Sequence, residues 1–128
     1  MNGTHPNGIL TLKASGAIEK GDIVLRNGGK AVRAGASGAT GALVGAALDA
    51  AADCTEVPVA LFGAHPGTML VKASSGVTGA VGGYMLQDGA VVDSAPNSTG
   101  GTVIGRVVAP ADADGLVEIA HVVPVHYA

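Results

Sequence analysis

The chain has 128 residues, and its seven Lys and Arg against ten Asp and Glu give a net charge of −3 at pH 7. Nucleic-acid binding needs clustered positive charge and commonly aromatic side chains that stack on bases, whereas the aromatic residues here are Phe62, Tyr84 and Tyr127. The uncharged stretch 34–48 is shorter than the roughly 20 apolar residues of a membrane-spanning helix. We therefore expect no nucleic-acid partner, no membrane partner and, from the first residues, no signal peptide.

Glycine and proline shape the expected fold, because the chain contains 21 Gly and 6 Pro. Such frequent interruptions favour short strands and turns within one domain. The apolar fraction is 48%, but it consists mainly of Ala and Val. Small side chains bury little area, at about 25 cal/mol per Å², against about 1–2 kcal/mol of backbone entropy per residue. We expect an oligomer, or a protein stabilised by docking on a partner.

Residues 1–14 predict an extended N-terminal arm. Asn2-Gly3 and His5-Pro6 interrupt regular structure, and few apolar residues surround them. Leu10 and Leu12 then alternate with polar residues, as in a strand. A strand at the end of a chain is free to pair with an open sheet edge on another protein.

The first module is expected at about 15–73. The segments 23–25 and 30–33 predict two strands joined by an Asn-Gly turn at 27–29. The segments 41–49 and 56–61 predict a second, longer hairpin. Residues 46–53 are Ala-rich and would also suit a short helix, but the glycines of the same stretch favour a strand and a turn.

The second module, at about 75–123, repeats this plan. Gly45 and Gly105 lie 60 residues apart, as do Gly16 and Gly76. A strand candidate at 68–72 precedes the module, and residues 124–128 are expected to form a C-terminal tail. The sequence thus predicts a mainly all-β fold, a small β-barrel domain built from two pseudo-repeated hairpin modules.

Metal and phosphate sites are not expected. A zinc site needs three or four converging ligands, and residues 121 and 126 would project to opposite faces of a strand. The segment 112–115 begins like a calcium loop, but the next carboxylate is at the wrong distance, so a turn is favoured. The Gly-rich stretch 35–45 lacks the Lys-Ser/Thr of a phosphate loop. We expect no cofactor and no metal; the four histidines are His5, His65, His121 and His126.

No catalytic set is predicted. Cys54 is the single cysteine and follows Asp53, a carboxylate that would disfavour a thiolate. A lone cysteine cannot form an internal disulfide, which suits synthesis in a reducing compartment. The serines lack the Gly-x-Ser-x-Gly pattern of a nucleophile elbow.

Three segments, 21–25, 41–52 and 57–63, resemble the small capsid decoration (cement) proteins of tailed bacteriophages. The second and third are similar to the matching hairpin of lambda-type head decoration proteins, and the similarity covers most of 15–123. The chain departs from the lambda-type pattern in its complete second module and its few aromatic residues.

The resemblance implies a β-tulip-like fold and no enzymatic activity. It also implies a protein made in the host cytoplasm that frequently forms homotrimers at threefold or quasi-threefold positions on the outer surface of the virion. The partner would be the major capsid protein, whose neighbouring subunits the protein would bridge to stabilise the shell. The resemblance also implies that an arm lies on the capsid, and by position that arm consists of Asn2, Gly3, Thr4, His5, Pro6, Asn7, Gly8, Ile9, Leu10, Thr11 and Leu12.

Two other classes of protein remain open on the sequence. A non-enzymatic β-barrel binding module of a larger complex, lipoyl-like, would need a modified lysine in a tight hairpin, and Lys30 follows the turn at 27–29. A small hydrolase or lyase would need a pocket with perturbed titratable groups. Mass analysis of Lys30, or turnover abolished by a histidine substitution, would identify these alternatives.

Overall fold

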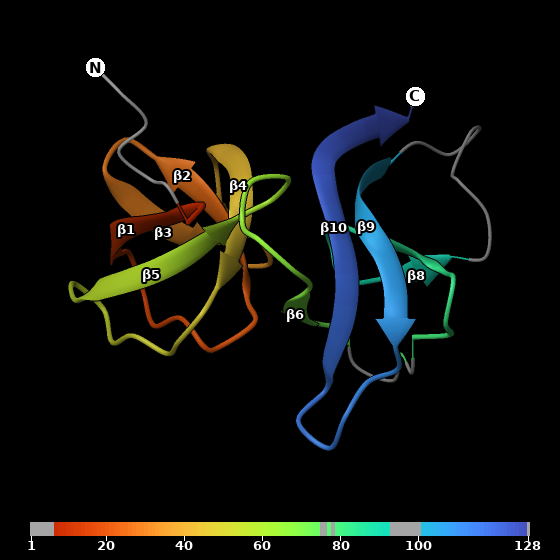
Figure 1. The fold of residues 1–128 in the computed structure, drawn as a ribbon. Coiled ribbons are helices and arrows are strands. Elements are labelled where there is room, and N and C mark those ends of the chain that lie inside the picture. The colour runs from red at the N-terminus through yellow and green to blue at the C-terminus, as the bar shows by residue number, and fades with distance from the viewer. Residues whose placement is uncertain (1–6, 75–76, 78, 93–100, 128) are drawn as a thin grey trace.

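A computed structural model describes residues 7–74, 77, 79–92 and 101–127, with the side chains of 125–127 not described. The described part of the chain is all-β, as predicted (Figure 1). No helix that could span a membrane is present in these residues. The strands are β1 Ile9–Ala14, β2 Ile23–Asn27, β3 Lys30–Arg33, β4 Ala42–Ala47, β5 Glu56–Leu61, β6 Met69–Lys72, β7 Tyr84–Leu86, β8 Val91–Val92, β9 Gly101–Ala109 and β10 Leu116–Tyr127.

The first half of the chain is a closed barrel in the order β1-β3-β2-β4-β5. The expected turn at 27–29 joins β2 to β3, and Gly28 has the positive φ of +62° that such a turn requires. Alternate side chains of the strands point inward and make one apolar cluster. Its buried members are Leu12, Ala14, Ile18, Val24, Ala31, Ala47, Val57 and Val59.

The first strand corrects the expectation of an arm at 1–14. β1 pairs antiparallel with β5 from Ile9 to Lys13 and parallel with β3 at Lys13 and Ala14, so it closes the barrel. Leu12 is only 5% exposed and belongs to the barrel interior. The alternation of leucines identified a strand correctly, but its partner is β5 of the same chain, because this pairing buries the leucines. Residues 1–6 lie outside the described part of the chain.

The second half is a five-stranded sheet in the order β6-β10-β9-β7-β8. Followed around the closed barrel in the other direction, the first five strands have the order β1-β5-β4-β2-β3. The second sheet has the same order, with each strand replaced by the one that comes five places later in the chain. The first half closes through β1–β3 pairing, whereas in the second half β6 and β8 are held near each other by a turn. There the amide of Ser74 donates to the carbonyl of Gly89 at 3.0 Å.

The registers of the two halves also match. Gly45 pairs with Leu61 between β4 and β5, and Gly105 pairs with His121, 60 residues later, between β9 and β10. Both glycines face a neighbouring carbonyl so closely that a side chain would collide with it, that of Ala60 or of Ala120 respectively. The predicted repeat of hairpins is therefore confirmed, and it extends to all five strands of each half.

The boundaries of the two repeated halves differ from those of the expected modules at 15–73 and 75–123. The first half begins with β1 and the second with β6, which lie 59 to 60 residues apart. The expected tail at 124–128 is also wrong up to Tyr127, because β10 continues and pairs with β9 at residues 125–127. An irregularity between His121 and Val125 lets the strand pass Pro124, which has no amide hydrogen to donate.

The Ala-rich stretch 46–53 forms no helix. Ala46 and Ala47 complete β4, and the backbone then turns, with the amide of Ala51 bonded to the carbonyl of Ile18 at 2.8 Å. The strand conformation is favoured over a helix because β4 lies between β2 and β5, and both sides of its backbone are paired. Tertiary pairing outweighs the weak intrinsic helix preference of alanine.

The two halves pack against each other through the outside of the barrel. Ile23, Ala46 and Ala60 form a row across β2, β4 and β5, and they point away from the barrel interior. All three are buried, because they join Phe62 and the interior side chains of the second half in a single core cluster. Figure 1 shows β6 lying between the barrel and β10, and the amide of Lys72 in β6 donates to the carbonyl of Gly21 at 2.8 Å.

Candidate functional site

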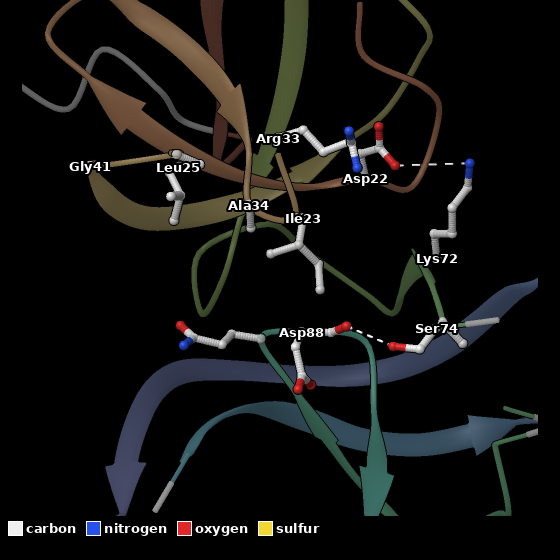
Figure 2. Close-up of a pocket in the computed structure, with 13 residues that line it drawn as sticks. Asp22, Ile23, Leu25, Arg33, Ala34, Gly41, Lys72, Ser74 and Asp88 are labelled. Carbon is white, nitrogen blue, oxygen red and sulfur yellow. Dashed lines mark hydrogen bonds and ion pairs between the residues drawn. The ribbon is translucent and has the colours of Figure 1, made fainter. Parts of the chain in front are cut away.

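A cavity of about 480 Å³ lies at the junction of the two halves. Ile23 points into it from β2, and the turn of the second half around Ser74 and Asp88 forms the opposite wall (Figure 2). The hydroxyl of Ser74 donates to the carbonyl of Asp88 at 2.7 Å, so it is engaged in closing the second half. The cavity is wide open, and it follows the seam between the halves.

Three charged side chains of this seam, those of Glu19, Asp22 and Lys72, interact with one another. Asp22 is only 5% exposed, and its carboxylate accepts the amide hydrogen of Glu19 at 2.8 Å. The ammonium of Lys72 pairs with Glu19 and lies 3.9 Å from an oxygen of Asp22. These contacts tie a loop of the barrel to β6 and give the seam a structural role.

Glu19 is electrostatically perturbed by this arrangement. The hydrogen bond from Lys72, and then its positive charge, hold the pKa of the Glu19 carboxyl below its ordinary value of 4.5. A carboxyl with a lowered pKa stabilises the folded state when it is ionised, above its pKa in the unfolded chain, and this contribution disappears as the pH falls through the folded pKa. Glu19 is fully exposed, so solvent screens the interaction, and the carboxyl stays ionised at neutral pH.

Cys54 lies at the end of the barrel in the connection from β4 to β5, where it is exposed and free. The amide of Gly16, and then the thiol of Cys54, hydrogen-bond the Asp53 carboxylate and lower its pKa. Cys54 also has a positive φ of 68°, which completes the turn. The hydrogen bonds of Asp53 and the backbone conformation of Cys54 stabilise the turn between β4 and β5.

The segment 112–115 forms the turn that the sequence predicts. The carboxylate of Asp112 accepts the amide hydrogens of Asp114 at 2.8 Å and Leu116 at 3.0 Å. These bonds fix the connection between β9 and β10. Within the described residues, no group of three or more His, Cys, Asp or Glu side chains is arranged to hold a metal.

Two histidines that are distant in sequence lie together beside the linker between the halves. The ring centroids of His65 and His121 are 6.3 Å apart. Nδ1 of His121 accepts the amide hydrogen of Gly63 at 2.8 Å, and Nδ1 of His65 lies 3.1 Å from the carbonyl oxygen of Asn7. His5 lies outside the described residues, as does the side chain of His126. Sequence reasoning missed this pair because no local spacing links positions 65 and 121.

The candidate arm is divided by the structure. Residues 2–6 lie outside the described part of the chain, whereas 9–12 belong to β1. Gly8 packs against the backbone of the linker at Ala64 and His65, so a side chain at this position would collide with it. Of the described arm residues, Thr11 is exposed on β1 and Leu12 is buried. Residues 9–12 of the expected arm are therefore part of the barrel.

The second half exposes a row of side chains that matches the buried row of the barrel. Tyr84, Arg106 and Ala120 are paired neighbours across β7, β9 and β10, as Ile23, Ala46 and Ala60 are across β2, β4 and β5. The guanidinium of Arg106 lies 4.2 Å from the centre of the Tyr84 ring and also donates to the carbonyl of Gly82. We call Tyr84, Arg106 and Ala120, with the nearby Val108 and Val122, the outer row.

The outer row is open to solvent where the barrel row is covered. Arg106 and Ala120 are exposed, and Tyr84 is half-buried. Val108 and Val122, two positions further along β9 and β10, are 44% and 40% exposed. Because β9 and β10 run antiparallel, the two valines lie on opposite sides of the row, and these exposed apolar side chains together with Tyr84 and Arg106 are typical of a surface that contacts another protein.

The fold and these contacts define a small all-β protein made of two matching five-stranded halves, of which the first is a closed barrel. No protein-family model matches the chain, and no curated protein matches it.

Proposed function

We propose that the protein is a non-enzymatic component of a phage virion that binds the outside of the capsid and cements the shell by bridging neighbouring major capsid subunits. The proposal starts from the resemblance of the segments 21–25, 41–52 and 57–63. It is supported by the all-β fold with a closed barrel. Following the same resemblance, the protein acts as a homotrimer at threefold positions.

The observation that carries the proposal is that equivalent faces of the two halves differ in burial. In the barrel, the row Ile23, Ala46 and Ala60 is buried against protein. In the second half, the members of the matching outer row are exposed, apart from the half-buried Tyr84. The outer face of the barrel sheet is thus covered by the second half of the chain. The matching face of the second half, which carries the outer row, is available for contact with another protein. We assign capsid contact to the outer row.

This assignment moves the capsid contact away from the N-terminal segment. To lie on a shell as an extended arm, residues 9–12 would have to leave the barrel, which would break the pairing of β1 with β5. The outer row needs no such rearrangement. Its centre combines Tyr84 and Arg106, residue types that are enriched at energetically important interface positions.

A structural role also agrees with the paired state of the chemically active groups. The Lys72 ammonium is paired with carboxylates, the Ser74 hydroxyl with a carbonyl, and the Asp53 carboxylate with an amide hydrogen. Weak contacts repeated over many copies would hold the protein on a shell through effective concentration.

Co-sedimentation with expanded, undecorated capsids of the phage that encodes the chain tests the proposal. We expect bound copies to saturate at a fixed multiple of the threefold positions. Capsids already decorated to saturation are the control and should take up little further protein. Absence of binding to undecorated capsids at micromolar protein, with a compact monomer in solution, would contradict the proposal and favour the binding-module alternative.

A further inference from the structure

The linker between the halves is fastened by an unusual hydrogen bond. It leaves β5 at Phe62, which is buried in the core that the two halves share. The next residue, Gly63, donates its amide hydrogen to Nδ1 of His121 on β10 at 2.8 Å. The linker is thereby attached to the second half through an imidazole, a type of side chain that can be neutral or protonated.

The direction of this bond defines the protonation state of His121. An imidazole nitrogen that accepts a hydrogen bond carries no hydrogen, so the neutral ring has its proton on Nε2. Nε2 is shielded from solvent and has no hydrogen-bond partner in the part of the chain that the structure describes. Protonation would place a second donor on Nδ1, opposite the amide hydrogen of Gly63, and a positive charge on a shielded ring. Both effects disfavour the closed contact.

Gly63 has little freedom to adjust to a protonated ring. Its φ is +81°, and a Cβ at this position would lie 2.8 Å from the amide nitrogen of Val123. The backbone of β10 is therefore in close contact with the linker at Gly63, the residue that makes the bond. Loss of the bond to His121 would therefore act at the place where the backbones of the linker and β10 are in close contact.

Among the residues that the structure describes, the groups around His121 do not compensate a positive charge. The linker contributes His65, a second imidazole whose centroid is 6.3 Å away. On β9 the residue paired with His121 is Gly105, and the guanidinium of the adjacent Arg106 is held at Tyr84. The nearest carboxylate along β10, Glu118, accepts the hydroxyl hydrogen of Thr68.

From this geometry we propose that His121 is an acid-sensitive latch between the two halves. When His121 is neutral, its bond to Gly63 fastens the linker to β10. When His121 is protonated, the bond is lost and the linker separates from β10, which loosens the packing between the barrel and the second sheet. The latch does not depend on what the protein binds.

Amide NMR of the uniformly labelled protein tests the latch between pH 7.5 and 5.0, the interval around the ordinary histidine pKa of about 6.5. We expect the Gly63 amide resonance to move with the same midpoint as the His121 ring. Hydrogen exchange at Gly63, corrected for its intrinsic pH dependence, should accelerate roughly tenfold as His121 is protonated. A Gly63 resonance that is insensitive to the His121 titration would overturn the proposal.

The variant His121→Asn is the matched test, because the amide oxygen of asparagine can replace Nδ1 as an acceptor and does not titrate. Gly63 should then be insensitive to pH, while the variant His65→Asn should keep most of the wild-type response. A full pH response in His121→Asn would contradict the latch. If that variant fails to fold, nitrogen shifts of the wild-type His121 ring decide the question: a neutral ring with hydrogen on Nε2 supports the latch, and hydrogen on Nδ1 refutes it.

Discussion

Deletion of residues 1–12 should abolish the folded barrel, whereas deletion of residues 1–6 should leave it intact. The longer deletion removes most of β1, which pairs with β5 along Ile9–Lys13 and with β3 at its end. It also removes the buried Leu12 from the barrel interior. Loss of one buried leucine side chain alone costs about 2–5 kcal/mol, against a total stability of about 5–15 kcal/mol for a typical domain.

Circular dichroism and thermal unfolding distinguish the two deletions. The variant without residues 1–12 should show no cooperative transition, and the variant without 1–6 should unfold within a few degrees of the intact chain. A cooperative transition at the wild-type temperature after removal of 1–12 would mean that β1 is dispensable, as expected of an arm. The same result would reopen residues 9–12 as a capsid contact.

Replacing Gly45 by alanine should destabilise the protein by about 3 kcal/mol or more, at the upper end of the cost of overpacking. A Cβ at position 45 would penetrate the carbonyl oxygen of Ala60 on the neighbouring strand β5, and backbone atoms cannot move aside without breaking the sheet. For a chain of this size the loss corresponds to roughly 10 °C in unfolding temperature.

Gly29→Ala is the matched control, because a Cβ at this position meets open space and no positive φ is required. Its stability should stay within about 1 kcal/mol of wild type. Gly105→Ala should resemble Gly45→Ala, since its Cβ would lie 2.6 Å from the carbonyl oxygen of Ala120. Equal stability of Gly45→Ala and Gly29→Ala would show that β4 and β5 are not packed as described.

The hairpins of both halves could be predicted because their signals are local. Alternating apolar residues, an Asn-Gly turn and glycines 60 residues apart identified the strands and the repeat. The role of β1 could not be predicted in this way, since alternation reveals a strand but not its partner, and β5 is distant in sequence. One usable signal was missed: Lys13-Ala14-Ser15 recurs as Lys72-Ala73-Ser74, which marks β1 and β6 as equivalent strands.

The end of β10 and the functional surfaces were less accessible to sequence reasoning. The expected tail at 124–128 continues β10 up to Tyr127, because an irregularity of the pairing accommodates Pro124. The outer row could not be predicted because Tyr84, Arg106 and Ala120 come from three strands and become neighbours only through the register of the sheet. Recognising the outer row as a contact surface also requires knowing that the matching row of the barrel is covered. That burial follows from the packing between the two halves, which the sequence pattern does not reveal.

The most direct test of the account compares two charge substitutions in the capsid-binding assay. Ala120→Asp places a carboxylate in the exposed outer row, and Thr11→Asp places one on the exposed side of β1. After both variants are shown to fold, we expect Ala120→Asp to reduce capsid occupancy at least tenfold and Thr11→Asp to bind like wild type. Wild-type occupancy by Ala120→Asp together with a loss in Thr11→Asp would contradict the assigned surface and return the capsid contact to the N-terminal segment.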